Sequence, residues 1–72
     1  MQFIINGQSR EFAALPLSAT VADLIGSLEL KGDRVAIEHN GSIVSRAEWG
    51  TTAIQQGDRF EIVHFVGGGA GE

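Results

Sequence analysis

Two Asn-Gly pairs, Asn6-Gly7 and Asn40-Gly41, constrain the fold of this chain more than any other feature. Both residues of such a pair tolerate positive φ angles, which the two central positions of a tight β-hairpin turn require. Segments rich in strand-forming residues flank each pair, at 1–6 and 8–12 around the first and at 34–39 and 42–45 around the second. The sequence therefore predicts two β-hairpins.

One helix is predicted between the hairpins. It begins at Thr20, because the stretch from Thr20 to Asp23 matches a Thr-x-x-Asp capping pattern. Apolar residues then recur at the spacing i, i+3, i+4 and i+7 and form one stripe: Val21, Leu24, Ile25 and Leu28. Such a stripe predicts that the helix covers one face of a sheet.

The strongest strand pattern lies near the end of the chain, at 59–66, after an irregular segment or short helical turn at 46–52 in which Trp49 is expected to pack. The predicted class is α+β, with a mixed sheet of four to five strands packed on one main helix. If Phe60 faces the helix, Val63 and Phe65 face outward by strand parity. An exposed apolar pair of this kind predicts a docking surface.

Composition limits the class of protein. With 72 residues the chain forms one small domain, and without cysteine it has no disulfide, thiolate metal site or cysteine nucleophile. The formal net charge of −4 argues against nucleic acid as a partner, and no apolar run approaches the length of a membrane span. We therefore expect a cytoplasmic protein that binds neither nucleic acid nor membrane.

Glycine is concentrated at the end of the chain, where four of the ten glycines occupy the last six positions. Because glycine lacks a Cβ atom, such a segment can enter a narrow slot in another protein, and three residues reach about 10 Å. The alternative is a frayed terminus. We expect a domain at 1–66 followed by a flexible glycine-rich tail at 67–72.

Other side chains give weaker signals. His39 and His64 lie on different predicted strands and have neither the spacing of metal ligands nor that of a catalytic pair, so we predict no metal and no catalytic residue. The acidic residues are spread singly, and we expect no pocket in a domain of this size. The glycines do not match a phosphate-binding loop, because no helix and no lysine follow them.

In the order of its segments, the chain resembles the ThiS family of thiamine-biosynthesis sulfur carriers. The segments that carry the resemblance are the first hairpin, the helix start at Thr20, the 35–41 segment, the Arg46-Ala47-Glu48-Trp49 stretch and the closing 57–69 segment. The resemblance covers residues 1 to 69. It implies a ubiquitin-like β-grasp fold, in agreement with the order of strands and helix predicted above. It also implies that the protein is a sulfur-carrying cosubstrate and not an enzyme.

In this family the carboxylate of the last glycine reacts. A ThiF-type adenylyltransferase uses ATP to form an acyl-adenylate, a sulfur donor converts this to a thiocarboxylate, and thiazole synthase, ThiG, accepts the sulfur. The resemblance implies that Gly69 carries the acyl group and that Gly67, Gly68 and Gly69 enter the partner's active site. Strand parity adds Val63, Phe65 and Val66 as partner contacts. The chain itself is expected to bind no cofactor.

The chain departs from this pattern at residues 70–72, which follow the glycines. Some carriers of the wider group lose such an extension to a metallopeptidase, and we predict cleavage after Gly69. The extension is also compatible with a chain that has lost the carrier role, or with residues added in cloning. Two alternative functions stay open as well: a sulfur carrier for another pathway, of the molybdopterin or cysteine type, and a ubiquitin-like interaction module that is never activated.

Overall fold

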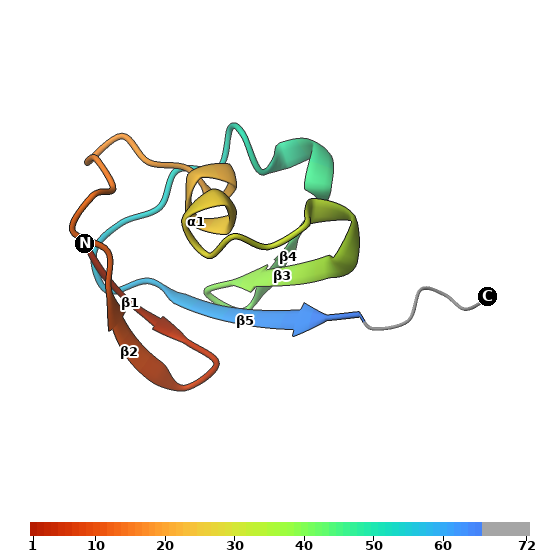
Figure 1. Cartoon of the computed structure of the whole chain (residues 1–72), viewed down its shortest axis with the longest axis horizontal. Coiled ribbons are helices and arrows are strands. Elements are labelled where there is room, and N and C mark those ends of the chain that lie inside the picture. Colours follow the sequence, from red (N-terminus) through yellow and green to blue (C-terminus); the bar gives the residue numbers. More distant parts are fainter. Residues whose placement is uncertain (66–72) are drawn as a thin grey trace.

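The computed structural model describes residues 1–65 and contains a five-stranded sheet with one α-helix packed on it (Figure 1). The strands lie in the order β2-β1-β5-β3-β4. The pairing of β1 with β5 is parallel and the other three pairings are antiparallel. In chain order the elements are β1 (Gln2–Ile5), β2 (Gln8–Glu11), α1 (Val21–Ser27), the 3-10 turn η1 (Gly32–Arg34), β3 (Val35–His39), β4 (Ser42–Val44), the 3-10 turn η2 (Arg46–Glu48) and β5 (Arg59–His64).

Both hairpins form at the Asn-Gly pairs. Asn6 and Gly7 have φ angles of 51° and 82°, and Asn40 and Gly41 have 51° and 90°. Two successive positive φ angles are typical of the type I′ turn, whose twist matches that of the flanking strands. The two turns therefore fix the register of β1 with β2 and of β3 with β4.

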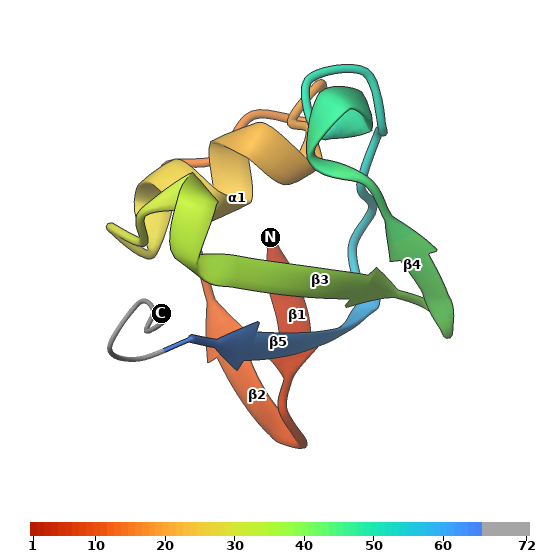
Figure 2. The same ribbon diagram turned by 90° about the vertical axis from the view of Figure 1, so that its right-hand side faces the viewer.

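The helix covers one face of the sheet, and Figure 2 shows α1 crossing above β1, β3 and β5. The apolar stripe of α1 is buried at Val21, Leu24 and Ile25. It packs in a core with residues of the sheet, of the loop before α1 and of the 46–58 segment: Phe3, Ile5, Ala19, Val35, Ile37, Trp49, Ile54 and Phe60. The opposite face of the sheet, which we call the outer face, carries no helix among residues 1–65.

Backbone contacts fix the start of α1 against the segment that leads to β5. The N–H groups of Val21 and Ala22 donate to the carbonyls of Thr52 and Trp49, each at 3.0 Å. These donors have no partner within the helix itself, so the 49–52 segment satisfies them. At the same end, the Asp23 carboxylate accepts a hydrogen bond from the Thr20 backbone N–H at 2.9 Å, as the capping pattern predicts.

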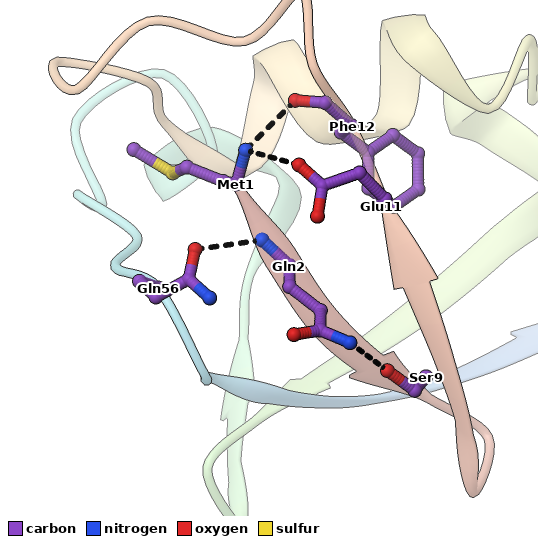
Figure 3. A network of polar contacts seen from close by, with 6 residues as sticks. All are labelled: Met1, Gln2, Ser9, Glu11, Phe12 and Gln56. Carbon is purple, nitrogen blue, oxygen red and sulfur yellow. Dashed lines mark hydrogen bonds and ion pairs between the residues drawn. The ribbon is translucent and has the colours of Figure 1, made fainter.

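A polar network holds the beginning of β1 in place (Figure 3). The N-terminal ammonium of Met1 donates to the Phe12 carbonyl at 3.0 Å and lies 3.2 Å from the Glu11 carboxylate. The Gln2 backbone N–H donates to Oε1 of Gln56 at 2.8 Å. The network therefore ties β1 to β2 on one side and to the turn before β5 on the other.

The structure confirms the predicted α+β class and the β-grasp arrangement of a mixed sheet on one helix. The 46–52 segment forms the short turn η2, and Trp49 is buried in the core. The helical stripe extends less far than predicted, because Leu28 is only half-buried at the end of α1. The proposed division between residues 66 and 67 falls outside the described residues and stays a prediction.

Candidate functional site

The end of β5 presents apolar side chains on the outer face. Val63 and Phe65 are 57% and 51% exposed, as strand parity predicts. The pairing with β3 fixes their direction, because Val63 lies opposite Ala36 and the Phe65 N–H donates to the Arg34 carbonyl at 2.7 Å. Strand β5 thus places an exposed apolar pair immediately before the glycine-rich segment of the sequence.

Four of the predicted site residues lie outside the described residues: Val66, Gly67, Gly68 and Gly69. Of the six that the sequence singled out, the structure therefore places Val63 and Phe65. Both lie on the same strand face, two positions apart. Their exposure agrees with a role as partner contacts, and that role stays a prediction.

The inner side of the same strand borders a pocket of about 250 Å³, which contradicts our expectation that a domain of this size has none. The pocket lies beyond the last pair of β1 with β5, which is Ile5 with Phe60. Its walls come from the first hairpin, from the residues after α1 and from β5, and include Asn6, Arg10, Leu28, Leu30, Ile62 and His64.

Sequence reasoning missed Arg10 as a residue of this pocket. Its register could have revealed it, because Arg10 lies opposite the buried Phe3 across the first hairpin. Residues directly opposite in an antiparallel pair share a face. Arg10 therefore points to the helix side of the sheet although its side chain is exposed, and it lies at the rim of the pocket.

A second polar cluster lies at the other end of β5. The Nε2 atom of His39 lies 2.7 Å from Oδ2 of Asp58, and the ring of His39 stacks on Phe60 with centroids 4.9 Å apart. The same Asp58 oxygen accepts the Gln55 backbone N–H at 2.8 Å. The side chains of His39 and Asp58 are only 16% and 15% exposed.

The Asp58 carboxyl has a lowered pKa. Burial raises this pKa, but hydrogen bonds from His39 and from the Gln55 backbone, together with the charge of His39, outweigh burial. The sequence did not predict the cluster, because its two polar members are 19 residues apart and meet only through the pairing of β3 with β5. The cluster lies beside the second hairpin turn, at the start of β5 and at the opposite end of that strand from Phe65.

His39 and His64 lie on adjacent strands but at opposite ends of their pairing, since His39 is opposite Phe60 and His64 is opposite Val35. Within residues 1–65, no three side chains of His, Cys, Asp or Glu lie close enough together to hold a metal ion. No helix in the described part of the chain is long and apolar enough to cross a membrane.

Known proteins are similar to this chain in both sequence and fold. The model of the ThiS family matches residues 3–69. The chain is 41% identical over 70 residues to a thiazole synthase of Paramagnetospirillum magneticum; this match covers 97% of the chain but only 21% of that protein, so the chain spans about a fifth of its length. It is 30% identical over 69 residues to the sulfur carrier protein ThiS of Escherichia coli, with 96% of the chain and 100% of that protein covered.

Among solved structures, a thiamine biosynthesis protein (ThiS) from Geobacter metallireducens superimposes with a TM-score of 0.80 at 28% sequence identity. The superposition covers 96% of this chain and 100% of that one. The family model, a carrier matched over its full length and a matching fold agree with one another. The chain belongs to the ThiS family.

Proposed function

We propose that the chain is a sulfur carrier in thiamine biosynthesis and that Gly69 carries the sulfur. The observation that supports this most strongly is the extent of the family match, which runs over residues 3–69 and ends at Gly69. Gly68 and Gly69 are then the closing pair of glycines, and residues 70–72 lie beyond the matched range.

The chemistry needs a free carboxylate at Gly69. Hydrolysis of the peptide bond between Gly69 and Ala70, by a metallopeptidase, would release residues 70–72 and leave that carboxylate. An oxygen of the carboxylate then attacks the α-phosphorus of ATP, and pyrophosphate leaves. A sulfide ion attacks the carbonyl of the resulting acyl-adenylate, and AMP leaves, which gives the thiocarboxylate directly. A persulfide donor would instead give an acyl disulfide, which a thiol cleaves to the thiocarboxylate and a new disulfide.

The chain is a cosubstrate in this scheme and not a catalyst. Its partners are a ThiF-type adenylyltransferase, which binds the ATP, and the thiazole synthase ThiG, which accepts the sulfur. The chain binds no cofactor of its own. Because activation consumes ATP, we place the reaction in the cytoplasm.

One comparison supports thiazole synthase as the acceptor. A protein named thiazole synthase contains, within its own length, a segment that matches 97% of this chain. Joining a carrier-like segment to a synthase in one polypeptide keeps the two at a high effective concentration, which is useful where they act on the same intermediate. The exposed pair Val63 and Phe65, with Val66, would dock on the partners while the segment 67–69 enters their active sites.

Intact-mass spectrometry tests the proposal. The chain ending at Gly69 is incubated with a ThiF-type enzyme, ATP and a sulfur donor, and we expect the mass gain that accompanies replacement of one oxygen by sulfur. The full-length chain should give no such product until a metallopeptidase has removed residues 70–72. Absence of the adduct from the truncated chain would refute the carrier role.

Two matched glycine variants locate the reacting residue. Gly69→Val in the truncated chain should abolish the adduct, because a side chain obstructs the narrow channel of the activating enzyme. Gly71→Val in the full-length chain should be processed and loaded normally, since that residue is discarded. The loaded carrier is then mixed with either ThiG or the large subunit of molybdopterin synthase. The acceptor that removes the sulfur identifies the pathway.

A further inference from the structure

Within residues 1–65, strand β5 has one neighbouring strand along its last residues. Its pairing with β3 continues to His64, whereas its pairing with β1 is confined to Arg59 and Phe60. Figure 1 shows β1 and β2 diverging from β5 toward their hairpin turn while β5 continues beside β3. We call the side of β5 that faces away from β3, at His64, the open β5 edge.

The hydrogen bonds of β5 show which backbone groups reach this edge. The Arg59 carbonyl and the Phe65 N–H bond to β3-side partners, whereas the Phe60 carbonyl accepts from the Asn6 N–H at 2.9 Å on the other side. Backbone groups of alternate residues point to alternate sides of a strand. The N–H and C=O of His64 therefore point out of the open β5 edge, where residues 1–65 provide no partner strand.

A single side chain occupies the edge one step earlier. The Asn6 amide donates to the Ile62 carbonyl at 3.1 Å and accepts the Ile62 N–H at 2.7 Å. Asn6 thus takes the place of one residue of a neighbouring strand and closes the edge at Ile62. His64 is left as the first position at which an added strand can pair.

The pocket lies directly beside this position, on the helix side of the sheet. Leu28, Leu30 and Ile62 contribute its apolar wall and Arg10 its charged rim. The Arg10 guanidinium lies 5.5 Å from the centre of the Phe12 ring, and no carboxylate among residues 1–65 forms an ion pair with it. In a chain of net charge −4, this leaves an unpaired cation beside an apolar hollow.

We propose that the open β5 edge and the adjacent pocket bind an extended segment of a partner protein, with an apolar side chain opposite His64 and a carboxylate two residues away. Side chains directly opposite on paired strands share a face, so the apolar side chain enters the pocket. The carboxylate, on the same face, reaches Arg10. This site goes beyond the carrier role, because it requires no chemistry at Gly69.

The chemistry of the edge favours an extended peptide over other occupants. His64 presents a backbone donor and a backbone acceptor, which are the groups that an added strand pairs with. Alternate side chains of the added strand then give specificity. A second copy of this chain fits less well, because a two-fold contact through the same edge would bring two Arg10 side chains into one interface.

Nuclear magnetic resonance of the isotope-labelled full chain tests the site. The probe is the acetylated and amidated peptide Ser-Glu-Thr-Leu-Thr-Glu-Ser, in which Leu and both Glu residues share a face when the peptide is extended. We expect saturable shifts of the methyl signals of Leu28, Leu30 and Ile62, with Ile43 on the outer face unchanged. The same peptide with N-methyl groups on both Leu and the following Thr should not bind, because one of these two amides donates to the His64 carbonyl whether the peptide runs antiparallel or parallel to β5.

Variants separate the charge of Arg10 from its packing. Arg10→Ser should weaken binding about two- to fivefold, the range of an exposed ion pair, and Arg10→Lys should restore most of it. Arg59→Ser is the matched control and should bind as the parent does, since Arg59 points to the outer face. The proposal is overturned by shifts centred on Ile43, by no saturation at millimolar peptide, by an unaffected Arg10→Ser variant, or by shifts that depend on protein concentration alone, which would indicate a second copy.

Discussion

Asn6 hydrogen-bonds both backbone groups of Ile62, a residue 56 positions further along the chain. The bond accepted by the side-chain oxygen is 2.7 Å long and the bond donated by the amide nitrogen is 3.1 Å long. Asn6 is also the first residue of the hairpin turn that follows β1. Its side chain therefore continues the pairing of β1 with the central strand β5 beyond the end of β1. This pair of contacts joins the two ends of the described chain.

Replacing Asn6 with glycine isolates those side-chain bonds, because glycine keeps the positive φ angle of the turn. We expect Asn6→Gly to lower the free energy of unfolding by about 1–2 kcal/mol, since two hydrogen bonds at an exposed edge are lost. Asn40→Gly is the comparison: its side chain accepts one bond from β5, from the Arg59 N–H at 2.9 Å. Urea unfolding of both variants should show the larger loss for Asn6→Gly, and an equal or reversed order would contradict the structural role given to Ile62.

The Asn-Gly pairs and the stripe beginning at Val21 show why most of the fold could be predicted from sequence. Turn chemistry and hydrophobic periodicity are local, and each fixes an element without information from the rest of the chain. The outward direction of Val63 and Phe65 followed from parity once Phe60 was assigned to the core. These predictions depended on spacing within one strand or helix.

The features that could not be predicted depend on pairing between distant segments. The parallel contact of β1 with β5 stops at Phe60, and this end point creates both the pocket and the open β5 edge. In the same way, His39 and Asp58 meet because Asn40 pairs with Arg59 across two strands. Periodicity indicates that strands exist, but it does not indicate where the pairing of two strands ends.

The His39–Asp58 pair predicts a specific pH dependence of stability. The pKa of Asp58 is held below its ordinary value in the folded protein, where hydrogen bonds from His39 and from the Gln55 N–H overcome the effect of burial. A carboxylate with a depressed folded-state pKa stabilises the protein above its unfolded-state pKa, near 4, and that stability is lost as the pH falls through the folded-state pKa.

We expect Asp58→Asn to be less stable than the parent by about 2 kcal/mol at pH 7, because a hydrogen-bonded charge in a largely buried site is removed. The difference should begin to shrink as the pH falls below about 4, where Asp58 of the unfolded parent becomes protonated, and should continue to shrink as the pH passes through the lower folded-state pKa. Thermal unfolding of both proteins between pH 2 and pH 7 measures this. Parallel stability curves across that range would show that Asp58 does not contribute the acid-sensitive stability.

Leu24 tests the contact between helix and sheet. Its side chain is fully buried in the core between α1 and the strands. Leu24→Ala should cost about 2–5 kcal/mol, which approaches the whole stability of a domain of this size. Leu17→Ala removes the same atoms from a side chain that is 92% exposed and should change stability by no more than about 0.5 kcal/mol. Similar unfolding midpoints for the two variants would mean that α1 is not packed as described.

Phe65 tests whether the outer face at the end of β5 docks on the activating enzyme. It is 51% exposed and precedes the glycine-rich segment, so a charge at this position should obstruct docking without unfolding the domain. We expect Phe65→Asp to raise the KM for adenylation by an adenylyltransferase of the ThiF type about tenfold or more, as burying an unpaired charge against an apolar partner costs at least ~1.4 kcal/mol.

Ile43→Asp is the matched control on the same face of the sheet. Ile43 is 71% exposed, but it lies on the edge strand β4, opposite Glu38 and far from the end of β5. Its variant should be adenylated with the parent's KM, and circular dichroism should show both variants folded. An equal effect of the two substitutions would indicate a docking surface that spans the whole outer face, whereas no effect of Phe65→Asp would remove the end of β5 from the contact altogether.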